Sequence, residues 1–207
     1  MKVYDLTFEI ENGMVHFEGD PVPKIIQVKS IKENGYNVKE IHMGTHTSTH
    51  IDAPSHFIEG GASVEKIDPL ALCGIYQVID ASEKKGITKE VIQKAKNEKV
   101  LFYTGSNLEW NVEKIFKNYS YITREAAEEI VNKGIKVVGI DSPTVEEPYE
   151  KNFPTHKILL GNNVLIIENL NSKLLKSIVG KSVLVIALPL KIKDGDGSPV
   201  RVLAIEI

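Results

Sequence analysis

Short runs of β-branched and aromatic residues recur along the chain, and Gly, Pro or Asn bounds most of them. Runs of about four to eight such residues between turn-forming residues are typical of β-strands. The pattern predicts strands at residues 3–8, 25–28, 38–42, 76–79, 100–103, 135–140, 164–168, 183–188 and 200–207. The first third of the chain therefore consists mostly of strands and loops.

Helix-type patterns separate the later strands. Thr88, Thr123 and Ser172 are good N-cap residues, and they predict helices over residues 88–97, 123–132 and 172–180. Strands followed by alternating helices and strands favour an α/β fold, in which helices pack on a mixed sheet. The sequence contains no GxGxxG motif or phosphate-binding loop, so we expect no nucleotide cofactor. Gly195-Asp196-Gly197 is interpreted as a turn between two strands.

Composition narrows the class of protein. With 207 residues, of which 42% are hydrophobic, the chain can form one globular domain over residues 1–207 with a substantial core. A net charge of -3 gives no basic excess for nucleic acid or an anionic membrane, so we expect neither partner. Cys73 is the single cysteine, the N-terminus lacks signal-peptide features, and no apolar run could span a bilayer. We therefore expect a cytoplasmic protein.

Four of the six histidines lie between positions 42 and 56, in a stretch that contains the segment THTSTHIDAPSH. His46, His50 and Asp52 offer two imidazoles and a carboxylate at gaps of four and two residues, a mixture that zinc and similar divalent cations favour. A polar loop whose histidines only cap turns is the alternative. The density of imidazoles and acids favours the metal site.

The residues around these histidines do not suit a regular helix. Threonine, serine and Ile51 are poor in helix interiors, Pro54 would end a helix, and the glutamate of an HExxH protease motif is absent. On a straight strand, His46 and His50 would lie about 13 Å apart, too far for one ion. We therefore expect a bent or single-turn segment leaving a strand, with freedom at its entrance supplied by Gly44.

Two residues outside this stretch are candidates to complete the site. His156 follows Phe153-Pro154-Thr155, which places it on a loop or at the start of a helix. Glu168 ends an apolar run, where a carboxylate is ordinarily a solvated residue at the edge of a sheet.

These residues together resemble the cyclase family of metal-dependent hydrolases, which includes bacterial kynurenine formamidases and isatin hydrolases. The family pattern HxGTHxDxPxH matches His46, Thr49, His50, Asp52, Pro54 and His56. Ser48 stands where the family usually has Gly, a change that affects the backbone because Ser enters positive φ less readily. The resemblance extends to residues 16–21, 104–105 with Trp110, 141–143, His156 with Glu168, and 189–205.

The resemblance implies a barrel-like mixed sheet with packed helices, and a homo-oligomer, either a dimer or larger. The resemblance also implies the roles of six residues. Five would be metal ligands, namely His46, His50, Asp52, His156 and Glu168, and His56 would be the catalytic histidine. Five ligands exceed a closed four-ligand zinc site, so two zinc ions that share Asp52 are the first choice, and one ion with a larger shell is the alternative. Manganese is the second candidate, because isatin hydrolases of this family use it.

The implied activity is hydrolysis of an amide by metal-activated water. An arylformamidase of tryptophan catabolism, which converts N-formylkynurenine to kynurenine and formate, is the first hypothesis. Hydrolysis of an isatin-like cyclic amide or a lactone is the second, and a non-catalytic metal-dependent binding protein is the third. His56 is expected to transfer the proton, although it is also placed to be a further ligand or to orient Asp52. Phe17, Tyr103 and Trp110 either line the pocket for an aromatic substrate or belong to the core.

The remaining polar residues have ordinary interpretations. His42 is expected to end a strand without binding metal, and His16 faces either the pocket or solvent. Asp141 either supports the site or starts a turn, and Cys73 is expected to be a buried thiol. The pair Glu146-Glu147 is interpreted as a solvated loop, with a role in covering the pocket as the alternative.

Overall fold

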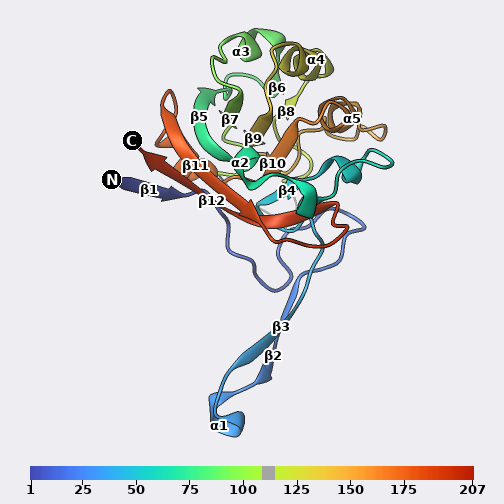
Figure 1. Ribbon diagram of the computed structural model, residues 1–207, viewed down its shortest axis with the longest axis vertical. Coiled ribbons are helices and arrows are strands. Elements are labelled where there is room, and N and C mark those ends of the chain that lie inside the picture. Colours follow the sequence, from blue (N-terminus) through green and yellow to red (C-terminus); the bar gives the residue numbers. More distant parts are fainter. Residues whose placement is uncertain (109–114) are drawn as a thin grey trace.

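The central sheet closes on itself into a barrel (Figure 1). Its strands are β12 (Gly197–Glu206), β11 (Ser182–Pro189), β5 (Cys73–Asp80), β7 (Lys99–Tyr103), β9 (Val137–Ile140), β10 (Leu165–Glu168) and β4 (His50–Asp52), in that order. The first residues of β12 pair with β4 and complete the ring, and the later ones pair with β1 (Lys2–Asp5). The length of β12, ten residues, allows both pairings.

Strands β5, β7, β9 and β10 run parallel, whereas β4, β11 and β12 join the barrel in antiparallel pairs. Three helices accompany the parallel strands among the described residues, namely α3 (Lys89–Gln93), α4 (Arg124–Asn132) and α5 (Pro154–Gly161). Every residue of β9 and β10 is buried, because these strands have the barrel interior on one face and helices on the other. The mixed α/β sheet expected from the pattern of strands and helices is therefore confirmed, and so is its barrel-like closure, which the family resemblance implied.

Two apolar cores result from the alternation of side chains along the strands. Leu101 and Tyr103 of β7 belong to the core that fills the barrel, with Ile51 and Ile167. Phe102 belongs to the second core, which lies between the sheet and helices α3 to α5. The same alternation turns His50, Asp52 and Glu168 away from the barrel interior, since their neighbours Ile51 and Ile167 point into it.

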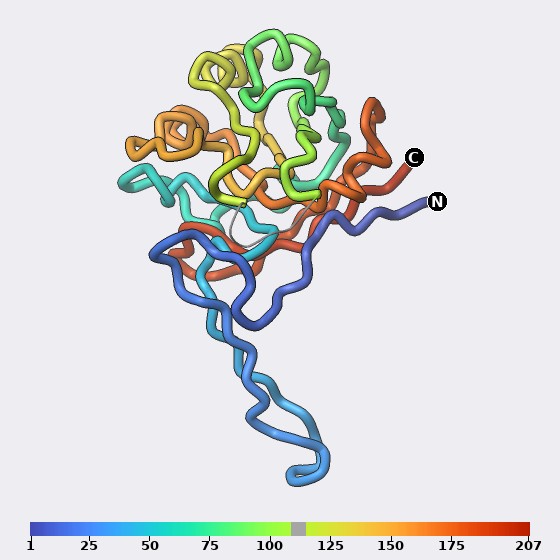
Figure 2. Tube along the Cα trace, turned by 180° about the vertical axis from the view of Figure 1, so that it is seen from behind, coloured from blue at the N-terminus to red at the C-terminus, as the bar shows by residue number. Residues whose placement is uncertain are grey.

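An arm extends from the barrel. It is a hairpin of β2 (Lys24–Lys29) and β3 (Val38–His42), with the short helix α1 (Ile31–Asn34) at its tip. Figures 1 and 2 show the arm extending alone along the long axis of the molecule. The smaller elements are α2 (Pro69–Leu72), β6 (Gly86–Ile87), β8 (Tyr121–Ile122), α6 (Ser172–Lys176) and 3-10 turns at Pro54–His56 and Val64–Lys66.

This computed structural model describes residues 1–108 and 115–207. Each predicted strand is present, although the first is shorter than expected and ends at Asp5. The helix at Thr123 has the predicted cap, because the Thr123 hydroxyl accepts from the amide of Ala126. The expected helix 88–97 ends at Gln93, and α6 ends at Lys176. None of the described helices is both long and apolar enough to cross a membrane.

Candidate metal centre

The histidine stretch forms a bend followed by a short strand. The backbone bends through residues 45–49, enters β4 at His50 and leaves it through the 3-10 turn at Pro54–His56. The predicted bend after a strand is confirmed, because β3 ends at His42 just before it, and a second strand, β4, follows directly after it. Ser48 has φ 63°, a left-handed conformation that Gly adopts more readily, which explains the family preference at this position.

Strand pairing brings the acids and imidazoles together. β4 lies between β10 and β12, with His50 opposite Glu168 on one side and Asp52 opposite Gly197 on the other. The Nδ1 atom of His50 lies 2.9 Å from the backbone oxygen of Ser48. An N–H donated there leaves the Nε2 lone pair free for a metal.

His156 enters from α5, which begins with Pro154 at its first position, where a missing N–H costs nothing. Its Nε2 atom lies 3.3 Å from Oε1 of Glu168 and 3.6 Å from Oδ2 of Asp52. Nε2 of His50 lies 3.4 Å from Oδ1 of Asp52 and 3.4 Å from Oε2 of Glu168. Asp52 and Glu168 are therefore flanked by two imidazole nitrogens.

His46 completes the arrangement from the bend, with Nδ1 at 2.8 Å from Oδ1 of Asp52. Its ring stacks on that of His56, with 3.9 Å between the ring centroids. The structure thus brings all six residues predicted for the site into one cluster, from three separate parts of the chain. Two overlapping groups of potential ligand atoms, each within 4.8 Å, share Asp52; they are His46, Asp52 and His56, and His50, Asp52 and Glu168.

The buried carboxylates of this cluster indicate whether it suits a cation. Asp52, Glu168, His50 and His156 each expose no more than 4% of their surface. Oδ2 of Asp52 is buried and has no hydrogen-bond partner. A buried, unpaired carboxylate oxygen is costly in a folded protein, and a coordinated cation would satisfy it. The residues therefore fit a divalent metal.

The acids control the pKa values of the imidazoles. Burial alone would lower the pKa of His50, but hydrogen bonds to Asp52 and Glu168 raise it to about 10. Burial likewise opposes the charge on His156, and Glu146 and Glu168 raise its pKa to about 10. Burial would raise the pKa of Asp52, yet the imidazoles of His46 and His50 hold it well below its usual range. Without a metal, protons on the rings balance the buried carboxylates.

His56 differs from the other histidines of the cluster. Burial lowers its pKa, and the charges of His46 and His156 act in the same direction, against the opposing charges of Asp52 and Asp196. Its side chain is also more accessible, at 27% exposed. At neutral pH the ring is therefore uncharged and able to accept a proton.

Two acids of the site were missed by the sequence interpretation. Asp196 does lie in the turn between β11 and β12, as predicted, but its Oδ2 atom lies 3.0 Å from Nε2 of His46 and 3.3 Å from Nδ1 of His56. Thr45 donates its hydroxyl to the other carboxylate oxygen at 2.8 Å. The sequence signal that could have identified Asp196 was its pair of flanking glycines. Gly197 lets the backbone of β12 approach His46 closely, because a Cβ at this position would lie 2.5 Å from Cε1 of His46.

Glu146 is the second acid. The prediction of a solvated loop was wrong at this position, because Glu146 is only 3% exposed. Its Oε2 atom accepts from Nδ1 of His156 at 2.9 Å and from the backbone amide of the same residue. This contact fixes the His156 ring with Nε2 toward the cluster. Glu147 is exposed, as expected.

A cleft of about 410 Å³ opens onto the cluster, with His46, His50, Asp52, His56, His156 and Glu168 among its lining residues. Aromatic rings form its walls in two pairs. Phe17 and Phe116 lie edge to face with 5.6 Å between centroids, and Phe57 and Phe153 lie 5.2 Å apart. His16 also lines the cleft.

The other interpretations fare differently. Of the expected aromatic wall, Phe17 lines the cleft, whereas Tyr103 belongs to the barrel core and Trp110 lies outside the described residues. His42 ends β3 on the arm and contacts Glu40, away from the cluster. Cys73 is half-buried, less than expected.

Among the described residues, Asp141 forms no hydrogen bond with the ligand cluster; it is fully buried and accepts from the amides of Thr104 and Gly105 and from the hydroxyl of Ser172. It thereby joins the loop after β7 to the start of α6.

Comparison with known proteins agrees with this geometry. The model of the Cyclase family matches residues 4–147. The chain belongs to this family. It is 37% identical over 205 residues to an uncharacterized protein of Methanocaldococcus jannaschii, covering 99% of this chain and 100% of the relative. It is 32% identical over 202 residues to the kynurenine formamidase of Bacillus mycoides, covering 95% of this chain and 94% of the relative.

Solved structures show the same fold for this cyclase-family chain. A potential metal-dependent hydrolase with cyclase activity superimposes with a TM-score of 0.82 at 34% identity, over 98% of this chain and 96% of the other. Isatin hydrolase A from Labrenzia aggregata, bound to benzyl benzoate, gives a TM-score of 0.87 at 25% identity, over 98% and 93%.

Proposed function

We propose that this chain is a metal-dependent arylformamidase that converts N-formylkynurenine to kynurenine and formate. One observation carries the proposal: an uncharged histidine, His56, stands beside a buried cluster of metal-ligand type at the floor of an aromatic cleft. Relatives that cover nearly the whole chain are kynurenine formamidases, which supports the same reaction.

The metal would be held by His46, His50, Asp52, His156 and Glu168. Two overlapping groups that share Asp52 suit two ions, and imidazole with carboxylate suits zinc first and manganese second. When bound, the metal supplies Lewis-acid activation of water and of the substrate carbonyl.

His56 transfers the proton in this proposal. Its Nδ1 atom faces Oδ2 of Asp196, so an N–H donated there leaves the Nε2 lone pair free. Nε2 accepts a proton as water attacks the formyl carbon, and it returns the proton to the nitrogen as the carbon–nitrogen bond breaks. The products are formate and the free aryl amine.

The cleft walls favour an aromatic substrate. The two phenylalanine pairs enclose a space above the cluster, and a planar ring between them would bury apolar surface on both faces. A cyclic aryl amide such as isatin has the same planar ring and the same amide bond. The likeness to an isatin hydrolase of 25% identity makes it the second candidate.

A hydrolysis screen tests the proposal. Purified protein, supplied with zinc or with manganese, is compared on N-formylkynurenine, simple N-formyl anilines, isatin and small lactones by kcat/KM. We expect a formamide to lead. If isatin or a lactone exceeded every formamide a hundredfold, about 2.7 kcal/mol of transition-state stabilisation, the formamidase assignment would be wrong. Bound metal without turnover of any substrate would instead indicate a binding protein.

Variants separate chemistry from metal binding. His56→Ala should keep its metal and lose on the order of a hundredfold or more in kcat, because a general acid and base is removed. His42→Ala, on the exposed arm, is the matched control and should leave kcat unchanged. Loss of metal from His56→Ala would identify His56 as a ligand.

A further inference from the structure

A second cavity, which we name the outer chamber, adjoins the metal cleft. Its volume is about 570 Å³, and the residues that line it come from three segments of the chain, within 16–18, 116–119 and 144–153. Six residues, four of them with aromatic rings, line both cavities and form the boundary between them, namely His16, Phe17, Glu18, Phe116, Thr144 and Phe153. A ligand with its amide at the metal cluster and a tail on its ring is therefore able to reach the outer chamber.

The walls of the two cavities differ in charge. The inner cleft is lined by the metal cluster and the phenylalanine pairs. Five charged residues line the outer chamber and not the inner cleft, namely Lys117, Lys151, Glu146, Glu147 and Glu150. An aromatic ring therefore suits the boundary, and a charged group suits the space beyond it.

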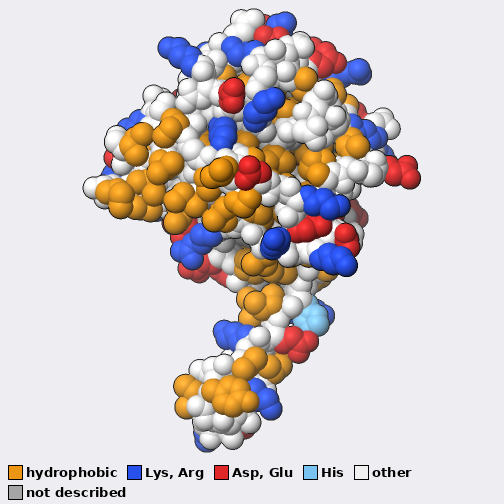
Figure 3. Space-filling model, in the orientation of Figure 1, with side chains coloured by type: hydrophobic (Ala, Val, Ile, Leu, Met, Phe, Trp, Pro, Cys, Tyr) orange, Lys and Arg blue, Asp and Glu red, His pale blue; other side chains and the backbone are white. Residues whose placement is uncertain are grey.

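Lysines alone do not identify a binding site, because most lysines lie at the surface. Figure 3 shows lysine, arginine and acidic side chains interspersed over one face of the molecule. Lys117 and Lys151 differ from such residues because both line one chamber. Neither forms an ion pair with an acid among the residues that the structure describes. Both ammonium groups are therefore available to a ligand.

Tyr119 supplies a third donor. It lines the same chamber and is only 5% exposed, yet its hydroxyl has no hydrogen-bond partner within the described part of the chain. A tyrosine hydroxyl in a nearly buried side chain usually finds a partner, and a ligand oxygen in the chamber would provide one. Burial raises the pKa of Tyr119, and the charges of Glu168 and Glu146 act in the same direction, so the hydroxyl stays protonated at neutral pH.

Most acids of the chamber already have partners. Three of them accept hydrogen bonds within the protein: Glu146 from His156, Glu147 from Tyr121 and Glu150 from the amide of Asn152. Glu18, at the boundary with the metal cleft, accepts none from the residues described in the structure. Glu18 is therefore the acid that is free to bind a ligand cation.

The sum of these charges selects the kind of tail. Glu146 belongs to the metal site through its contact with His156, so the chamber is left with three acids and two lysines, a net charge of -1. A tail with only a negative charge would be repelled by this excess of acids. An amino-acid group has no net charge, and it offers a carboxylate to the lysines and an ammonium to an acid.

We propose that the outer chamber binds a zwitterionic amino-acid group on the substrate, with its carboxylate at the two lysines and the Tyr119 hydroxyl and its ammonium at Glu18. The inference rests on the proposed function, because the metal site must act on an aryl amide whose ring carries this group. Phe17, Phe116 and Phe153 at the boundary would hold the ring between its two ends. The chamber thereby selects aryl amides with an amino-acid tail over those without one.

A pair of formamides tests the proposal. N-formylkynurenine and N-formyl-2-aminoacetophenone share the ring, the formamide and the neighbouring ketone, and only the first carries the amino acid. With zinc or manganese supplied, kcat/KM should be at least tenfold higher for N-formylkynurenine. Lys117→Met combined with Lys151→Met should lower this ratio on the order of tenfold, as should Glu18→Gln and Tyr119→Phe. Equal kcat/KM values in the wild type, or a ratio that none of the variants changes, would overturn the proposal.

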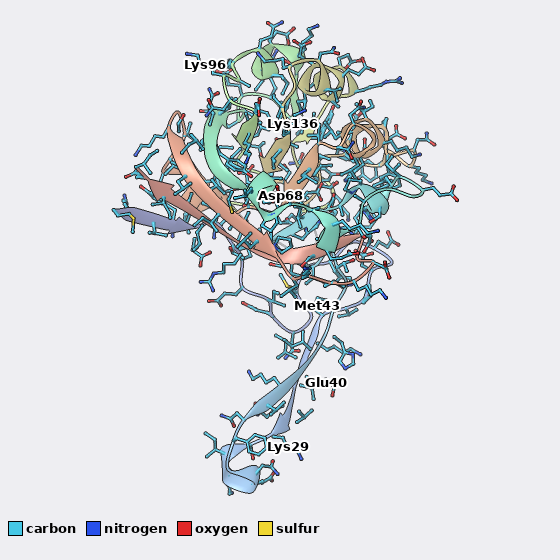
Figure 4. All side chains as sticks on the ribbon, in the orientation of Figure 1. Lys29, Glu40, Met43, Asp68, Lys96 and Lys136 are labelled. Carbon is cyan, nitrogen blue, oxygen red and sulfur yellow. The ribbon has the colours of Figure 1, made fainter. Side chains whose placement is uncertain are left out.

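Lys96→Met is the matched control, because Lys96 is exposed and Figure 4 shows it at the end of the molecule opposite the arm, outside the chamber. It should keep the wild-type ratio, and circular dichroism checks the fold of every variant. Calorimetry with kynurenine and with 2-aminoacetophenone measures the chamber without turnover. If no formamide were hydrolysed, the proposed function would fail, yet kynurenine binding that is tenfold tighter and is weakened by the lysine substitutions would still support the chamber. Equal binding of the two compounds would overturn it.

Discussion

Gly197 is the position where the structure predicts the sharpest effect of adding one methyl group. It begins β12, opposite Asp52 of β4, and an alanine Cβ there would lie 2.5 Å from Cε1 of His46 and 2.7 Å from the carbonyl oxygen of Ile51. Neither neighbour can retreat freely, because Ile51 is fully buried and His46 is held between two carboxylates. We therefore expect Gly197→Ala to separate β12 from β4 and to displace His46.

The added methyl group overpacks a closed structure, so the free energy of unfolding should fall by about 1–3 kcal/mol. The displaced imidazole should also weaken metal binding on the order of tenfold to a hundredfold. Urea unfolding of the metal-free protein measures the first effect, and competition with a chromophoric chelator measures the second. Gly161→Ala is the control, since its added methyl group meets only Ile58 Cδ1 at 3.5 Å at the end of α5. It should change stability by no more than about 1 kcal/mol. Parent-like stability and metal affinity in Gly197→Ala would refute this account of how the barrel closes around the site.

Other expectations concern the acids behind the histidines. Glu146→Gln should weaken metal binding on the order of tenfold or more, because it loosens the ring of His156, and chelator competition measures the change. Asp196→Asn should lower kcat on the order of tenfold or more while metal content is kept, because His56 loses the carboxylate that orients it; unchanged kcat would exclude that role. In the metal-free protein the pKa of His46 is raised to about 9 and those of His50 and His156 to about 10, so all three rings are protonated at pH 8. Their stabilising ion pairs are complete below pH about 6.5 and are lost as the pH rises through about 9 to 10. Zinc added at pH 8 should therefore release about three protons, measured by calorimetry in buffers of different ionisation enthalpy, and zinc affinity should rise with pH.

Local features of the chain made much of the fold and of the ligand cluster predictable. The strands were visible as apolar runs, and the gaps between His46, His50 and Asp52 pointed to a metal. His156 and Glu168 were candidates from their residue types, but only the resemblance to a family gave them the role of ligands, because neither has a distinctive neighbour in sequence. Their approach to Asp52 depends on the pairing of β4 with β10, which no local pattern encodes.

The missed residues share a physical reason. Asp196 is separated from His46 by 150 positions and reaches it only because β12 closes the barrel against β4. An acidic residue between two glycines predicts a turn, and this pattern is the same whether or not the carboxylate contacts another side chain. The sequence around Glu146 likewise predicts a solvated side chain, because an acidic pair before a proline is ordinarily exposed. Burial of such acids is decided by tertiary contacts, and here those contacts are histidines.

The strand that closes the barrel, β4, also carries residues of the candidate metal site. Strand β4 has three residues, and two of them, His50 and Asp52, turn their side chains toward the metal cluster while Ile51 fills the barrel. Such a short strand offers few hydrogen bonds to its two neighbours, and the buried acids Asp52 of β4 and Glu168 of β10 would repel one another without protons or a cation. A bound metal would therefore stabilise the seam between β10, β4 and β12, because binding energy available only in the folded state is folding energy. The same coupling explains why Gly197 matters: the backbone that closes the barrel also forms the surface against which His46 packs.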